Sequence, residues 1–185
     1  MWGEPLHPLH HGKDWAFTRI VSDDGYIIGV DNPFLNLQKH LAQTKGLSRI
    51  TVDDIDFNPI FRVGLFGSTH IVDCMSTDPA GYKFATYGPK IGILTNKNYH
   101  GRYLADAEWP VIGQLAMRDY SRVKHRRVSE LTQVEISLGP RKSVYRRLTM
   151  PLFGDRGEIS HVLVATVPDL IQIVPSSFHN EITRR

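Results

Sequence analysis

The sequence predicts an α+β fold in which helices pack against one face of an antiparallel β-sheet. The main sign is the segment 143–153, where apolar side chains such as Leu148 and Leu152 alternate with polar ones, as in a strand with one buried face. The turn text GDRG at 154–157 leads into a second apolar segment at 158–167, which indicates an antiparallel hairpin. A chain of 185 residues suits one such domain with an extension.

Composition limits the class of protein. The net charge is +3, and we interpret the basic segments 118–127 and 141–147 as solvated surface rather than as a nucleic-acid interface. A single cysteine, Cys74, excludes an internal disulfide and a multi-cysteine zinc site. Apolar runs are shorter than the ~18 residues of a membrane span, and the first residues lack a signal-peptide pattern, so we expect a cytoplasmic protein without membrane contact.

Residues 1–48 are assigned to an N-terminal extension whose first part is expected to be irregular. The histidines of its HPLHH text could share a metal ion, but no acidic or thiol ligand accompanies them, so we predict no metal site. Segments 15–21 and 26–30 are expected to pair as a short hairpin.

An amphipathic helix is predicted in the second part of the extension. It begins at Asn32 and Pro33, which suit a helix start, and Gly46 ends it. Its apolar stripe needs cover, either from the chain's own sheet or from a second copy, and we predict a symmetric homodimer. The stripe consists of Phe34, Leu35, Leu37 and Leu41.

The main domain is assigned to residues 49–168, and a C-terminal tail to 169–185. The acids Asp53, Asp54 and Asp56 near its start are interpreted as caps of short helical turns. Further along the chain, the pattern predicts two strands joined by a turn, short helical turns, an amphipathic helix and a third strand before the hairpin. These segments are 70–75, 76–81, 82–87, 88–109, the helix from Pro110 to about Val123, and 131–138.

This order of elements resembles the PAS domain, a five-stranded antiparallel sheet that holds helices against one face and can enclose a ligand between them. The text of several segments is similar to that of small stand-alone PAS proteins of alphaproteobacteria, and the similarity covers about 48–168. The matching segments are DID at 54–56, HIVDC at 70–74, FATYG at 84–88, HGRYLAD at 100–106, AMRDYSRV at 116–123 and YRRLTMPL at 145–152. The resemblance implies a sensory or regulatory module.

Motifs of common enzymes are missing from the sequence, which lacks GxSxG, a Walker loop, GxGxxG and HExxH. We therefore expect no catalytic residues. Arg118, Arg122 and Arg126 recur every four residues before VEISLG, as in cyclic-di-GMP-binding PilZ domains, but VEISLG has the wrong first residue and spacing. We interpret these arginines as an exposed helix face.

The resemblance implies a pocket for haem, flavin or a small organic molecule. Flavin photochemistry needs a cysteine in an asparagine-containing helical motif, whereas Cys74 falls on the first predicted strand of the main domain. Haem usually needs an axial histidine on the helices, where only His100 and His125 lie. Both are expected to be exposed, so a haem sensor is the alternative rather than the favoured reading.

We expect a non-enzymatic module that binds a small aromatic or aliphatic ligand, or a protein partner, and signals through protein contacts. An enzyme and a nucleic-acid-binding protein are the less favoured alternatives. The expected pocket lining is Phe84, Thr86, Tyr87, Tyr103, Trp109, Ile112, Tyr120, Leu148 and Met150.

Overall fold

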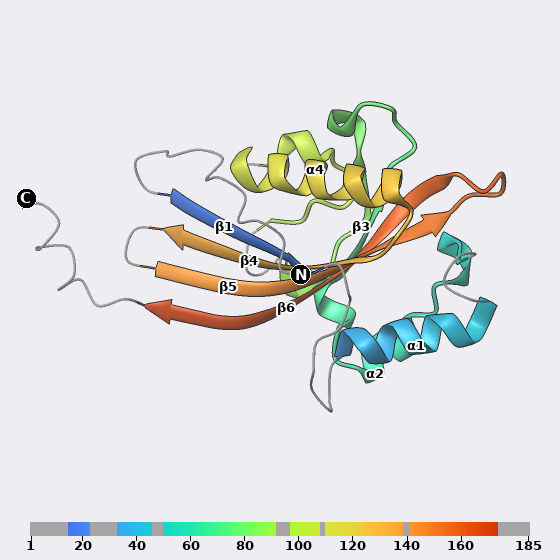
Figure 1. The fold of residues 1–185 in the computed structure, drawn as a ribbon, viewed down its shortest axis with the longest axis horizontal. Helices are drawn as coiled ribbons and strands as arrows, with labels where there is room; N and C mark the ends of the chain where they lie inside the picture. The colour runs from blue at the N-terminus through green and yellow to red at the C-terminus, as the bar shows by residue number, and fades with distance from the viewer. Residues whose placement is uncertain are drawn as a thin grey trace, which may run out of the picture.

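A single antiparallel sheet organises the chain (Figure 1). Its strand order is β1-β4-β5-β6-β2-β3, and every neighbouring pair is antiparallel. The computed structural model describes residues 15–22, 33–45, 50–91, 97–107, 110–138 and 141–173.

The predicted five-stranded antiparallel sheet is confirmed, but helices lie on both of its faces rather than on one (Figure 1). Its longest strands form the predicted hairpin, which closes through a turn in which Gly157 has a φ of 81° and the Gly154 N–H donates to the Glu158 carbonyl at 2.8 Å. β6 pairs with β5 as far as Ile173, so part of the expected C-terminal tail is strand. The strands are β2 (Thr69–Asp73), β3 (Lys83–Thr86), β4 (Glu130–Leu138), β5 (Arg141–Phe153) and β6 (Ile159–Ile173).

A sixth strand, β1 (Trp15–Ser22), comes from the N-terminal extension. It pairs with β4, with Trp15 opposite Leu138 and Ser22 opposite Leu131. The described part of the chain therefore gives β1 a distant partner, and the expected local hairpin stays a prediction. The proposed partner, 26–30, lies outside the described residues.

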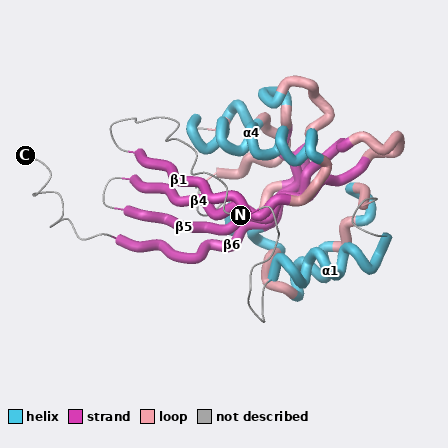
Figure 2. Tube along the Cα trace, in the orientation of Figure 1, coloured by secondary structure: helices cyan, strands magenta, loops and turns pink. Residues whose placement is uncertain are grey.

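The helix α4 (Pro110–Arg126) covers one face of the sheet, which we call the α4 face (Figures 1 and 2). Its predicted inward side is confirmed at Ala116, Tyr120 and Val123, which are all buried. These side chains share a core with others from the strands, from the turn η5 (Leu104–Asp106) and from Tyr82, which follows the turn η4 (Pro79–Gly81). That core includes Val72, Tyr82, Phe84, Leu104, Val162 and Val164.

The helices α1 (Pro33–Lys45) and α2 (Phe57–Arg62) lie on the opposite face, which we call the α1 face (Figures 1 and 2). Phe34, Leu37 and Leu41 are only 2%, 1% and 2% exposed, and they share a core with β5 residues such as Leu152. Leu35 is half-buried. The chain's own sheet covers this stripe in the structure, which favours the alternative that the sheet provides the cover, and the dimer interface stays a prediction.

The acids before α2 cap short helical turns, as predicted. Asp54 accepts from the backbone N–H and the hydroxyl of Thr51 at the start of η2 (Val52–Asp54), and Asp56 accepts from the Asn58 N–H at the start of α2. A further turn, η3 (Phe66–Ser68), leads into β2. Among the described residues, no helix has the length and apolarity needed to cross a membrane.

Candidate functional site

An aromatic cluster lies on the α4 face. The ring of Phe84 on β3 is centred 5.5 Å from His70 on β2, 5.1 Å from Tyr87 and 5.9 Å from Tyr99. Most of the pairs meet edge to face or tilted, which is the favourable arrangement of aromatic quadrupoles. Tyr120 on α4 completes the cluster, with its ring centre 6.4 Å from that of His70.

His70 is the polar centre of this cluster. Its side chain is 6% exposed, and its Nε2 lies 3.1 Å from the Tyr120 hydroxyl in a hydrogen bond between β2 and α4. Burial, with a smaller effect of the nearby Arg147 charge, lowers the pKa of His70 to about 3. The imidazole is therefore neutral at physiological pH. Its Nδ1 is buried and has no hydrogen-bond partner among the described residues.

Arg147 on β5 lies on the other side of Tyr120. It is 4% exposed, and its guanidinium carbon is 5.5 Å from the Tyr120 ring centre. Arg147 forms an ion pair with Asp119, the residue before Tyr120 on α4. Within the described part of the chain, its Nε has no hydrogen-bond partner.

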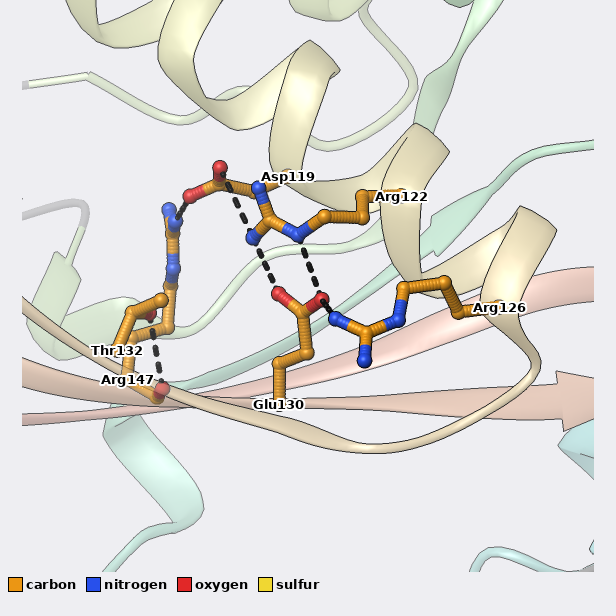
Figure 3. A network of polar contacts seen from close by, with 6 residues as sticks. All are labelled: Asp119, Arg122, Arg126, Glu130, Thr132 and Arg147. Atoms are coloured by element: carbon orange, nitrogen blue, oxygen red, sulfur yellow. Dashed lines mark hydrogen bonds and ion pairs between the residues drawn. The ribbon is translucent and has the colours of Figure 1, made fainter. Parts of the chain in front are cut away.

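The Arg147–Asp119 pair belongs to a series of two carboxylates and three arginines that extends towards the surface (Figure 3). Arg122 lies 3.4 Å from Asp119 and also donates to Glu130 on β4, with its Nε 2.6 Å from Oε1. Arg126 is 3.6 Å from the same Glu130 and has 48% of its side chain exposed. We call the series Arg147, Asp119, Arg122, Glu130 and Arg126 the ion ladder. It ties α4 to β4 and β5.

The Arg147–Asp119 pair of the ladder is charged at neutral pH. Burial raises the pKa of Asp119 to about 6, although Arg147 and Arg118 oppose this shift, so the carboxyl is mostly ionised at pH 7. Burial disfavours the charge on Arg147, but the Asp119 carboxylate outweighs this effect and raises its pKa. Burial also raises the pKa of Tyr120, so its phenol stays protonated.

The structure brings together some of the predicted pocket residues. Phe84 and Tyr120 are buried in the aromatic cluster, and Tyr87 packs against it half-buried. Thr86 lies beside them, but its hydroxyl accepts from the Ile71 N–H at 2.9 Å, next to a register shift between β2 and β3. Thr86 therefore stabilises the pairing of β2 with β3 at the edge of the sheet.

Other predicted pocket residues lie elsewhere. Leu148 and Met150 belong to the core on the α1 face, because side chains alternate along β5 and Arg147 takes the α4 face. Tyr103 is 48% exposed and stands near Lys83 at the surface. Trp109 lies outside the described residues, as does the side chain of Ile112.

The candidate cofactor ligands are not gathered at the cluster. His100 and His125 are exposed, and His125 hydrogen-bonds through Nδ1 to the Ser121 carbonyl at 2.8 Å. Cys74 is fully buried, and burial raises its thiol pKa to about 12. No group of three or more His, Cys, Asp or Glu side chains within the described ranges could hold a metal ion. A haem held by His100 or His125 does not fit this arrangement.

Sequence reasoning missed the polar residues of the site. His70 was read only as part of a strand, and Arg147 as solvated surface. The predicted exposed face of α4 is wrong at Arg122, which joins the ion ladder, and at Arg118, whose Nε and Nη2 are buried. A usable signal was the spacing of Asp119, Arg122 and Arg126 along one helix, three and four residues apart.

Comparisons with known proteins add little. No protein-family model matches the chain, and no curated protein matches it. A light-oxygen-voltage domain studied with a flavin analogue aligns at 12% identity and a TM-score of 0.41, over 63% of this chain and 87% of that one. An RNA-binding light-oxygen-voltage receptor aligns at 12% identity and a TM-score of 0.38, over 61% of this chain and 34% of that one. At this level of similarity, nothing follows about ligand or activity.

Proposed function

We propose that this chain is a non-enzymatic sensory or regulatory module of the PAS type, which binds a small molecule between α4 and the sheet. The observation that carries the proposal is His70, a buried imidazole whose Nδ1 has no partner among the described residues and which is surrounded by aromatic rings. An unpaired buried polar group costs about 1–3 kcal/mol. A bound molecule that supplies the missing partner removes this cost.

The protonation states around the site favour binding over catalysis. A general acid or base works best with a pKa near the operating pH. The pKa of His70 is about 3, that of Cys74 is about 12, and that of Tyr120 is raised above its ordinary value. These groups therefore stay in one protonation state at neutral pH and serve as fixed donors and acceptors.

The ion ladder couples the proposed ligand site to the position of α4. Tyr120 and Asp119 are adjacent on α4, and Arg147 contacts both of them. A ligand that hydrogen-bonds to Arg147 changes the free energy of the contact between Arg147 and α4. Binding therefore shifts the preferred position of α4 on the sheet. The exposed end of the ladder at Arg126 then carries the change to a protein partner.

Native mass spectrometry tests this function. Protein incubated with the low-molecular-weight fraction of a cell extract should retain a non-covalent compound that denaturation releases. Ala116→Val, on the α4 face, should lower retention by filling the site, whereas Ala165→Val, on the α1 face, is a matched control with normal retention. Folded protein that retains no compound, or equal loss in both variants, contradicts the proposal.

A further inference from the structure

We infer that the ligand of this site is a small aromatic carboxylate, or a compound with an equivalent oxyanion, that accepts hydrogen bonds from His70 and Arg147. The inference rests on the proposed function and adds the chemical class of the ligand. Its basis is the placement of two unpaired buried nitrogens, Nδ1 of His70 and Nε of Arg147, on residues that both contact Tyr120.

The hydrogen bond between His70 and Tyr120 decides which nitrogen of His70 carries the proton. The Arg147 guanidinium carbon lies 5.5 Å from the Tyr120 ring centre, and a guanidinium offers only donors, so we assign the phenolic proton to the side that faces His70. The phenolic proton is then free to donate to Nε2 of His70, 3.1 Å away. A neutral imidazole that accepts at Nε2 carries its proton on Nδ1. In this assignment, the unpaired Nδ1 is a donor.

The missing partner is an acceptor. Within the described part of the chain, the buried side-chain atoms without a hydrogen-bond partner are Nδ1 of His70, Nε of Arg147, Nε and Nη2 of Arg118, and Oε2 of Glu158. The nitrogens belong to residues on or facing α4, whereas Glu158 lies in the β5–β6 turn, where its backbone carbonyl accepts from Gly154. Such donors bind a carboxylate more strongly than a neutral acceptor, because the hydrogen bonds are charge-assisted.

The balance of charged side chains around the site also favours an anionic ligand. Arg118, Arg122 and Arg147 are the buried or half-buried arginines of this region, and Asp119 and Glu130 are its buried carboxylates. Among these five described residues, the arginines outnumber the carboxylates by one. A buried charge is costly without a counter-charge, and an anionic ligand would supply one.

The rings around His70 select the body of the ligand. Phe84, Tyr99 and Tyr120 are 8%, 6% and 2% exposed, whereas Tyr87 is half-buried, with its ring centre 5.9 Å from that of His70. Tyr87 is therefore the most exposed ring of the four, and the inferred ligand would take the space beside the imidazole that its ring now occupies. A planar aromatic group fits that space and keeps the edge-to-face contacts.

Isothermal titration calorimetry with benzoate and its neutral isostere benzamide tests the inference at constant ionic strength. The two probes share the aromatic body and differ in charge. Benzoate should bind saturably, and about tenfold or more tightly than benzamide, as expected for charge-assisted hydrogen bonds.

Variants locate the binding. His70→Phe keeps a ring but removes the Nδ1 donor, and Arg147→Met removes the charge; each should weaken benzoate binding by about tenfold or more. Arg122→Met breaks the ion ladder on the far side of Asp119, so it controls for loss of the ladder itself and should leave affinity within about threefold. Far-ultraviolet circular dichroism confirms folding, and His70→Phe suffices if Arg147→Met does not fold.

Equal binding of benzamide, unchanged benzoate affinity in His70→Phe, or an equal loss in Arg122→Met overturns the inference. If neither probe binds but mass spectrometry finds a retained neutral compound, the proposed function stands and the oxyanion inference falls. If neither probe binds and no compound is retained, both fall.

Discussion

Arg147 on β5 and Asp119 on α4 form an ion pair in which only 5% and 2% of the side chains are exposed. The two residues are 28 positions apart in the chain, so the contact fixes α4 on the sheet. It also places Arg147 against Tyr120, the hydroxyl of which reaches His70. His70, Tyr120, Arg147 and Asp119 thus form one connected group.

Asp119→Ala should be strongly destabilising. Removal of one partner of a buried ion pair leaves the other charge uncompensated, so we expect the free energy of unfolding to fall by about 3–5 kcal/mol. Urea denaturation followed by circular dichroism measures the change. The matched control is Arg126→Gln, which removes a partly exposed partner of Glu130 and should cost less than about 1 kcal/mol. Similar costs for the two variants would mean that the ladder is not buried as described.

His70 should make stability depend on pH. Its folded-state pKa, about 3, is lower than the ordinary 6.5, so the unfolded chain binds more protons between these values. The contribution of His70 is therefore fully present above pH 6.5 and is lost as pH falls towards 3. Between pH 7 and pH 5 the loss is about 2 kcal/mol, from ~1.4 kcal/mol per unit.

His70→Gln removes this titration and keeps a polar side chain. The stability of the wild type should fall more than that of the variant between pH 7 and pH 5, by about 2 kcal/mol. His125→Gln, at an exposed position, should follow the wild type. Parallel pH profiles for the wild type and His70→Gln would show that His70 is protonated in the folded protein at pH 5.

Local patterns in the sequence predicted most of the fold. Alternation along 143–153 and the turn text GDRG depend on neighbouring residues, and both gave correct elements. The pairing of β1 with β4 depends on segments more than a hundred residues apart, as in Trp15 and Leu138, and neither segment encodes its partner. The apolar stripe of α1 predicted that this side of the helix is buried, but it did not predict which surface buries it.

The site was predicted less well, for a physical reason. A strand with polar and apolar sides usually exposes its polar side, so Leu148 and Met150 were assigned to the pocket and Arg147 to solvent. Helices cover both faces of this sheet, and Arg147 stays buried because Asp119 supplies its counter-charge. That pairing between distant residues is not visible in composition or periodicity.

Leu37 should contribute strongly to stability. It is 1% exposed on the α1 face, and Leu37→Ala should cost about 2–5 kcal/mol by removing packed methyl groups. Phe61→Ser, at a position 70% exposed, should stay within about 0.5 kcal/mol. Sedimentation of Leu37→Glu tests whether the stripe is buried within the chain or between two copies. A dimeric wild type and a folded, monomeric Leu37→Glu would show that the stripe forms a dimer interface.

Gly88 should tolerate no side chain. A Cβ there would lie 2.5 Å from the Gly67 carbonyl oxygen and 2.8 Å from that of Thr69, and neither backbone atom moves easily. Gly88→Ala should therefore cost about 1–3 kcal/mol. At Gly113 on α4 the nearest atom is 3.1 Å away, and helix propensity favours alanine by about 1 kcal/mol, so Gly113→Ala should cost less. The reverse order in thermal unfolding would contradict the packing.

The most direct test of the central claim is a crystal structure of the protein with the compound that native mass spectrometry identifies. We expect that compound between α4 and the sheet, within hydrogen-bonding distance of Nδ1 of His70 and beside Phe84 and Tyr87. The compound bound elsewhere, for example in the surface groove between Lys124 and Glu158, with only ordered water at His70, would contradict the claim.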